Sequence, residues 1–200
     1  MIERPTALTF DDGDALLIVD VQNDFCPGGA LAVKEGDRVV PQINAWIEQA
    51  DLQRITVLAS RDWHPKDHVS FEPAGGEWPP HCIQDSAGAR FHADLNLPDR
   101  TVVVTKGVRF DRDQNSAFAD TGLDAYLQRK GVRRLFLCGL ALDVCVLATA
   151  LDARQAGFEV VLINDATRAV DPQKVSAALT RMGEAGVAMT DPGAPGAGAQ

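Results

Sequence analysis

ALLIVDV, residues 15–21, is the stretch of sequence that decides the fold. It is apolar without alternation, which is typical of a parallel strand covered on both faces. Similar but mostly shorter runs follow it at 55–60, 101–105, 134–139, 159–165 and 186–189. Between these runs, apolar residues recur with the helical period at 39–47, 123–127, 144–151 and 175–182. Strands that alternate with helices predict an α/β sandwich: a mainly parallel sheet of about six strands, flanked by helices.

The composition fits one globular domain of ordinary size. The chain has 200 residues, of which 46% are hydrophobic, enough for a single core. Its formal net charge of −9 disfavours nucleic acid and anionic membrane surfaces as partners. No apolar run is long enough to span a bilayer, and the N-terminus is acidic where a signal peptide would be basic. We therefore predict a cytoplasmic protein whose four cysteines stay reduced.

Two segments lie outside the alternation of strands and helices. Residues 61–100 contain five prolines and little periodicity, and such a long connection marks a candidate functional loop. The last ten residues, DPGAPGAGAQ, have nothing to bury, so we expect residues 191–200 to be a disordered tail. Residues 1–190 would then form the single domain.

Asp20 and Lys106 come at the ends of two predicted strands. The carboxyl ends of parallel strands share one edge of the sheet, which is where sites form in such folds. Either residue alone has an ordinary explanation, as a turn cap for the aspartate and as a solvent-exposed charge for the lysine. Buried together at neighbouring strand ends, they would stabilise each other's charge.

Cys145 occupies a position typical of a nucleophile. The segment GLALD, residues 139–143, should turn the fourth strand into a helix and place Cys145 in its first turn. Unpaired N–H groups and the helix dipole favour a thiolate there and could hold a developing oxyanion. Cys138 lies within the predicted strand and is most simply a core residue. Cys26 and Cys82 lie in loops and have no assigned role.

Three of the four histidines gather in the long loop together with an aspartate. The group is Asp62, His64, His68 and His81. A single histidine would more often be a surface or packed residue, but imidazole and carboxylate together suit Zn, Fe(II) or Mn(II). The sequence therefore predicts one divalent metal ion at this loop. His92 has no such neighbours and is interpreted as structural.

Phe25 and Trp78 are candidate walls for a flat ring, because each is an aromatic residue in a loop near the same edge of the sheet. The glycine-rich phosphate loops of nucleotide-binding proteins are absent from the sequence. We therefore predict a site for a small aromatic molecule and no site for a nucleotide phosphate.

These motifs resemble those of the nicotinamidases and pyrazinamidases, which are isochorismatase-like hydrolases. The matching stretches are DVQNDFCPGGALAV (20–33), RDWHPKDHVSF (61–71), EWPPHC (77–82), KG (106–107) and GLALDVCVLATALDA (139–153). The resemblance runs from about Ala15 to Met189. It implies a Rossmann-like three-layer sandwich and one isochorismatase-like hydrolase domain over residues 1–190. One departure is Leu142, where the family more often has threonine, so a hydroxyl near the site is missing.

The resemblance also implies roles for the candidate residues. The catalytic triad would be Asp20, Lys106 and Cys145. The metal ligands would be Asp62, His64 and His81, with His68 a fourth in some members. The oxyanion hole would be the backbone N–H groups of Ala141 and Cys145, beside a cis peptide bond at 140–141, which is rare between non-proline residues. Phe25 and Trp78 would sandwich a pyridine ring.

Three functions remain open at this point. The first is hydrolysis of nicotinamide to nicotinate and ammonia through a thioester on Cys145. The second is the same chemistry on another small amide or carbamoyl compound, although such sister enzymes usually lack the metal-binding set. The third is a non-catalytic metal-binding or redox-sensing domain, which would not explain why Asp20 and Lys106 reach one edge. The sequence also leaves open which metal is bound and whether the protein is a homo-oligomer.

Overall fold

The computed structural model describes residues 9–190, and the predicted disordered tail lies outside them. The strands are β1 (Asp14–Val19), β2 (Thr56–Asp62), β3 (Val102–Lys106), β4 (Arg134–Leu140), β5 (Glu159–Arg168) and β6 (Ala188–Met189). The helices are α1 (Val40–Leu52), α2 (Leu123–Arg129), α3 (Leu147–Gln155) and α4 (Val175–Glu184). Short helical turns are η1 (Asn23–Phe25), η2 (Gly36–Val39), η3 (Glu72–Ala74), η4 (Leu142–Val146) and η5 (Pro172–Lys174). All the strands and helices that the sequence predicts are present.

The six strands are all parallel and lie in the order β3-β2-β1-β4-β5-β6. This order confirms the predicted α/β sandwich. The chain builds the sheet outward from β1 on one side through β2 and β3, then crosses to β4 on the other side. The connections that follow β1 and β4 therefore diverge, and a crevice opens between the carboxyl ends of these two strands.

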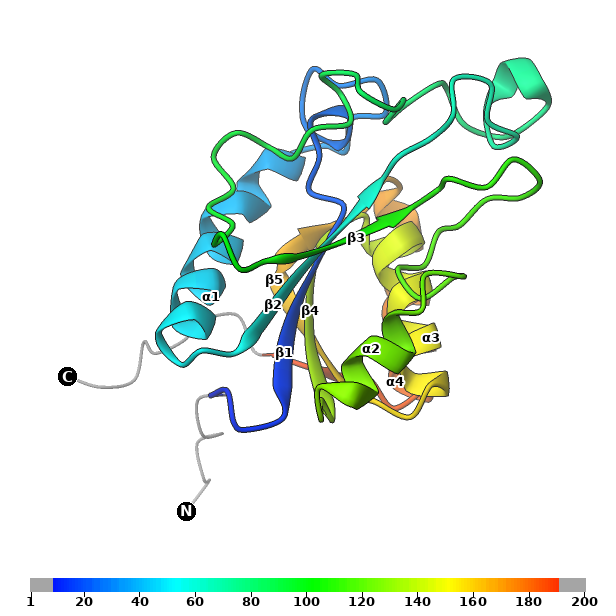
Figure 1. The fold of residues 1–200 in the computed structure, drawn as a ribbon. Coiled ribbons are helices and arrows are strands. Elements are labelled where there is room, and N and C mark those ends of the chain that lie inside the picture. The colour runs from blue at the N-terminus through cyan, green and yellow to red at the C-terminus, as the bar shows by residue number, and fades with distance from the viewer. Residues whose placement is uncertain (1–8, 191–200) are drawn as a thin grey trace.

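Two apolar cores fill the space between the sheet and the helix layers. Leu16 and Ile18 of β1 pack in the core that contains Trp46 of α1, whereas Leu17 and Val19 pack in the core on the opposite face. Figure 1 shows α1 on one face of the sheet and α2, α3 and α4 on the other. The central strand is therefore buried on both faces, which explains why its sequence is apolar without alternation. Within residues 9–190, no helix is long and apolar enough to cross a membrane.

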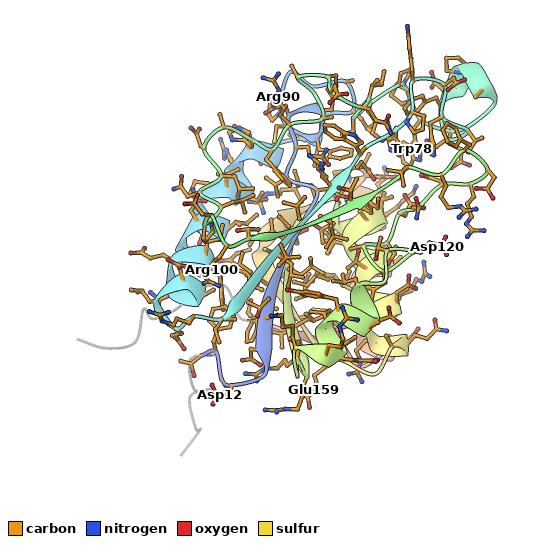
Figure 2. The ribbon with its side chains drawn as sticks, viewed as in Figure 1. Asp12, Trp78, Arg90, Arg100, Asp120 and Glu159 are labelled. Carbon is orange, nitrogen blue, oxygen red and sulfur yellow. The ribbon has the colours of Figure 1, made fainter. Side chains whose placement is uncertain are left out.

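The long connection between β2 and β3 is irregular, as predicted, and η3 is the one helical turn that the structure describes in it. It folds back on itself beside the end of β2. His64 N–H donates to the Cys82 carbonyl at 2.9 Å, and Gln84 N–H donates to the His64 carbonyl at 2.9 Å. Figure 2 shows Trp78 on this loop, at the end of the molecule opposite to Asp12 and Glu159. The loop thus covers the carboxyl-terminal edge of the sheet.

Candidate active site

Four buried side chains meet where β1, β2, β3 and β4 end. Asp20 directly follows β1, and Asp62 and Lys106 are the last residues of β2 and β3. Cys145 lies in η4, the turn between β4 and α3. The backbone of Asp20 has a left-handed φ of 48°, which turns the chain out of the sheet at this point. The topology therefore brings two carboxyl groups, a lysine ammonium group and a thiol to one place.

Lys106 is the centre of this group. Its Nζ atom lies 2.7 Å from Asp20 Oδ2, 2.6 Å from Asp62 Oδ1 and 3.5 Å from Cys145 Sγ. The lysine side chain is completely buried, so the two carboxylates replace the water that its ammonium group has lost. A carboxylate oxygen of Asp20 and the Cys145 sulfur lie within 4.8 Å of each other. Lys106 thus holds an acid and a thiol side by side.

Burial and neighbouring charges give the two carboxyl groups different proton affinities. Burial raises the pKa of Asp20 above its usual value, although Lys106 acts to lower it. The hydroxyl of Ser60 also lowers this pKa, through a 2.6 Å hydrogen bond that it donates to Asp20 Oδ1. Burial acts to raise the pKa of Asp62 as well, but Lys106 and His64 outweigh it and hold this pKa well below the usual range. Asp20 is therefore the better proton acceptor of the two.

The surroundings of Cys145 act on the pKa of its thiol in opposite directions. We expected the start of a helix to favour the thiolate, but burial raises the pKa of Cys145 well above its usual value, with Lys106 acting against the rise. Desolvation of the sulfur outweighs the helix-terminal position here. The thiol can become a nucleophile only if a neighbouring group takes its proton, and Asp20 lies beside it.

The turn that carries Cys145 has the backbone form that the resemblance implies. The peptide bond between Leu140 and Ala141 is cis. Ala141 and Cys145 both line the same pocket.

Asp62, His64 and His81 form a group that could hold a metal ion. Each offers one ligand atom, and these atoms lie within 4.8 Å of one another. His64 Nδ1 lies 2.9 Å from the Gly107 carbonyl oxygen, and His81 Nδ1 lies 2.8 Å from the Pro79 carbonyl oxygen. A ring whose Nδ1–H donates to a carbonyl has Nε2 free as a ligand, which is the usual arrangement in metal-binding histidines.

His68 lies directly beside this group. Its ring centroid is 4.4 Å from that of His64, and its Nδ1 atom lies 2.7 Å from Ser70 Oγ. Its Nε2 atom is buried and has no hydrogen-bond partner among the described residues. Burial lowers the pKa of His68 and of His81, which favours the neutral imidazole that binds metals. The donors and the unpartnered nitrogen both fit a divalent metal ion.

Gly107 leaves the space that these side chains occupy. Its φ is 69°, and a Cβ atom at this position would lie 2.5 Å from His64 Cε1 and 3.1 Å from Asp62 Oδ1. A side chain here would displace the His64 ring, because carbon atoms do not approach this closely. The glycine after Lys106 is therefore required by the shape of the site.

A pocket that is partly open to solvent joins the thiol to the metal-type donors. Its walls combine apolar side chains with polar ones. The apolar residues are Phe25, Leu31, Trp78, Ala141, Val144 and Val170, and the others are Asp62, His64, His81, Asp113, Asn115 and Cys145. A small flat ring with one polar substituent suits such a lining.

A family model decides where this fold and site belong. The model of the isochorismatase domain matches residues 14–192. The chain belongs to the isochorismatase family. Among proteins of known activity, the nicotinamidase of Escherichia coli (strain K12) is 40% identical to it over 198 residues, which cover 88% of this chain and 93% of that protein.

Solved structures agree with this membership of the isochorismatase family. The pyrazinamidase of Pyrococcus horikoshii in complex with zinc superposes with a TM-score of 0.87 at 41% identity, over 90% of this chain and 99% of that one. PnC1 from L. infantum in complex with nicotinate superposes with a TM-score of 0.88 at 44% identity, over 93% of this chain and 96% of that one. The Rossmann-like sandwich implied by the sequence motifs is thereby confirmed.

The isochorismatase fold brings together all the candidate residues that the sequence analysis named. Those that line the pocket are Phe25, Asp62, His64, Trp78, His81, Ala141 and Cys145, and those that are buried next to them are Asp20, His68 and Lys106. His92, interpreted as structural, accepts a hydrogen bond from Asp94 N–H at 3.2 Å. Cys138 is buried in β4, and Cys26 and Cys82 are buried as well.

Gln22 is a functional residue that the sequence analysis missed. Its Nε2 atom donates to the Asp62 carbonyl at 2.8 Å and to the Ala89 carbonyl at 2.9 Å, and its Oε1 atom accepts from Asp62 N–H at 2.8 Å. One side-chain amide thus holds both backbone groups of Asp62. The signal in the sequence was weak, because Gln22 and Asp62 are 40 positions apart.

Asp113 and Asn115 are two further pocket residues that were missed. Both come from the segment after Lys106, where no motif distinguishes a site residue from an ordinary surface residue. Their place in the pocket follows from the path of this loop, which the sequence pattern does not predict.

Proposed function

We propose that this member of the isochorismatase family is a nicotinamidase, which hydrolyses nicotinamide to nicotinate and ammonia. The observation that carries the proposal is a single pocket in which a buried thiol faces the same space as a metal-type donor group. Phe25 and Trp78 give this pocket aromatic walls for the pyridine ring. The E. coli nicotinamidase and the nicotinate complex of the L. infantum protein support this choice of substrate.

Asp20, Lys106 and Cys145 would carry out the first half of the reaction. Asp20 accepts the thiol proton of Cys145, and the sulfur attacks the carboxamide carbon of the substrate. The charge that develops on the carboxamide oxygen is held by the backbone N–H groups of Ala141 and Cys145. Lys106 keeps Asp20 ionised before this transfer and stabilises the thiolate during it. Asp20 then returns its proton to the leaving nitrogen, so ammonia departs and a thioester remains on Cys145.

Water completes the reaction by attacking the thioester carbon. Asp20 accepts a proton from this water, and the same backbone N–H groups hold the oxyanion for a second time. Collapse of the intermediate breaks the carbon–sulfur bond. The sulfur regains a proton from Asp20, the carboxylic acid releases its remaining proton to solvent, and nicotinate leaves with Cys145 restored as a thiol.

In the proposed reaction, the metal ion would help to bind the pyridine ring of the substrate. Asp62, His64 and His81 would hold one divalent ion, with His68 as a fourth ligand through its unpartnered Nε2. Zinc, Fe(II) and Mn(II) all suit carboxylate and imidazole donors, and the zinc complex of the P. horikoshii relative favours zinc. When bound, the ion supplies a Lewis-acid contact for the pyridine nitrogen. The protein side chains orient the ring so that the carboxamide faces Cys145.

Replacing the nucleophile tests the assigned chemistry. Cys145→Ala should abolish the release of ammonia from nicotinamide and leave the metal content of the protein unchanged. Cys138→Ala is the matched control, because this thiol is buried in β4 and does not line the pocket. Turnover by Cys145→Ala at the rate of the control would show that another group is the nucleophile.

A substrate panel separates nicotinamide from other amides. The wild-type protein should release ammonia from nicotinamide faster than from benzamide, which lacks the ring nitrogen, and faster than from aliphatic amides or carbamoyl compounds. Mass spectrometry of rapidly quenched samples should detect the nicotinoyl adduct on Cys145. Activity on other amides without activity on nicotinamide would assign the protein to a sister enzyme, and the absence of any adduct or turnover would point to a non-catalytic domain.

A further inference from the structure

The loop after β3 brings a second carboxylate to the histidines of the proposed metal site. A carboxylate oxygen of Asp113 and ring nitrogens of His64 and His68 lie within 4.8 Å of one another. Asp113 is half-buried and lines the same pocket as His64. These three residues form a donor group of their own, beside the group of Asp62, His64 and His81.

The two donor groups describe one ion because they share His64. The Nδ1–H of this ring donates to the Gly107 carbonyl at 2.9 Å, so Nε2 is the one nitrogen of His64 that is free to bind a metal. A single nitrogen lone pair serves a single ion. The ring centroids of His68 and His81 both lie close to that of His64, at 4.4 and 4.8 Å. An ion at His64 Nε2 is therefore near the donors of both groups.

The position of Asp113 is built into the loop. Its Oδ1 atom accepts a 2.9 Å hydrogen bond from the N–H of Gln114. The Gln114 side chain is buried, accepts from Val108 N–H at 3.1 Å and donates to the Ala119 carbonyl, so it ties the two ends of the loop together. Asp113 is thus anchored at the point where the loop faces the histidines.

Asp113 also has no cation of its own in the part of the chain that the structure describes. Arg109 and Arg112 flank it in sequence, but Arg109 pairs with Asp111 and Arg112 pairs with Asp120. The loop therefore neutralises its exposed acids and leaves unpaired the one acid that faces the pocket. A half-buried carboxylate that faces the pocket without an ion pair is available to bind a cation there.

The charges of the whole site lead to the same conclusion. Asp20, Asp62 and Asp113 carry three negative charges in their ionised forms, and Lys106 carries one positive charge. Without Asp113, a divalent ion would leave the buried site with a net charge of +1. With Asp113, a divalent ion makes the site neutral, which is the most favourable state in a low-dielectric environment.

We propose that Asp113 is a metal-holding residue, which binds the ion from the loop after β3 and supplies the charge that makes the site specific for a divalent cation. This inference rests on the proposed metal-dependent function. It also explains why a loop that lines the substrate pocket carries a metal-facing acid: binding the ion fixes the loop, and with it Asn115, against the pocket.

The test measures metal affinity rather than turnover. Wild-type protein and Asp113→Asn are stripped with a chelator, and Zn²⁺ binding is followed by competition with a chromophoric chelator. Asp113→Asn keeps the shape of the side chain and removes its charge, so zinc should bind about 10- to 100-fold more weakly. Asp111→Asn is the matched control, because it removes the same charge from the exposed side of the same loop, and its zinc affinity should equal that of the wild type.

A second measurement separates a role in metal binding from a role in folding. Metal-free Asp113→Asn should melt at a temperature no lower than that of the metal-free wild type, since the substitution removes a negative charge from a site that lacks its cation. Equal zinc affinity of the two variants, or a loss of metal-free stability in Asp113→Asn alone, would overturn the proposal. If the wild type itself bound no zinc, iron or manganese, the metal would drop out of the proposed function and this inference would fall with it, whereas a wild type that binds metal without hydrolysing nicotinamide would contradict the function alone.

Discussion

Replacing Lys106 by methionine tests whether the buried cation holds the site together. Methionine keeps the length of the side chain and removes its charge, so Asp20 and Asp62 lose a partner at 2.7 and 2.6 Å. Breaking a fully buried pair by removing one member costs about 3–5 kcal/mol, because the charge that is left cannot be solvated. For a domain of this size each kcal/mol lowers the melting temperature by roughly 2–4 °C, so we expect a fall of about 6–20 °C.

The loss should depend on pH in a defined direction. Lys106 lowers the pKa of both Asp20 and Asp62, so both values rise when it is removed. The folded variant then binds protons more tightly than the unfolded chain, whose aspartates have a pKa of about 3.9. Its stability is therefore highest in acid and falls as the pH rises, by about 1.4 kcal/mol per pH unit for each proton involved. The destabilisation should be larger at about pH 7.5 than at about pH 5.

The assay is urea unfolding at both pH values, with chelator present throughout so that metal binding does not contribute. Lys34→Met is the matched control, because Lys34 is exposed, and its stability should stay within about 0.5 kcal/mol of the wild type. Adding Asp20→Asn to Lys106→Met should restore part of the loss, since one of the two unpaired charges is removed. A loss under about 1 kcal/mol, or one that is equal at both pH values, would refute the view that Lys106 is held by charge.

Two further predictions follow from the geometry of the site. Gly107→Ala should remove the bound metal while circular dichroism shows an intact fold, because a Cβ atom would lie 2.5 Å from the His64 ring; a full equivalent of metal after dialysis would contradict this. Ser60→Ala removes a hydrogen bond that lowers the pKa of Asp20, so this pKa should rise, and the pH below which kcat declines should move upward. An unchanged kcat profile would mean that the ionisation of Asp20 does not set the decline of kcat in acid.

The strands and helices were predictable because each is encoded locally. The run at 15–21 is apolar on both faces for the reason that β1 is central, and the structure shortens it to Asp14–Val19 because Asp20 turns the chain out of the sheet. Because parallel strands end at the same edge of the sheet, the strand predictions alone were enough to place Asp20 and Lys106 together. The histidines of the proposed metal site could be identified from the sequence of the long loop, because three of them lie close together in it.

The remaining site residues were not predictable because their roles depend on contacts between distant segments. The Gln22 side chain acts by binding the backbone of Asp62. Every residue type offers the same backbone groups, so the sequence does not reveal which residue Gln22 binds. Asp113 faces the histidines because Gln114 closes its loop, which is a matter of three-dimensional path. The burial of Cys145, which raises the pKa of its thiol, was not predictable for a related reason: position in a helix can be read from the sequence, but depth of burial cannot.

The spacing of the site along the chain has a consequence for how the protein comes into being. Ser60 meets Asp20 across 40 positions, Lys106 meets Asp62 across 44, and Cys145 meets Lys106 across 39, so each contact joins one strand-and-helix unit to another. Contacts of such long range form after the local ones, since a large loop must close for each. A chain emerging from the ribosome therefore has no neighbouring acid and thiol until β4 and Cys145 have been made. The catalytic group is therefore complete only after the central strands have paired, and the appearance of activity during refolding marks that pairing.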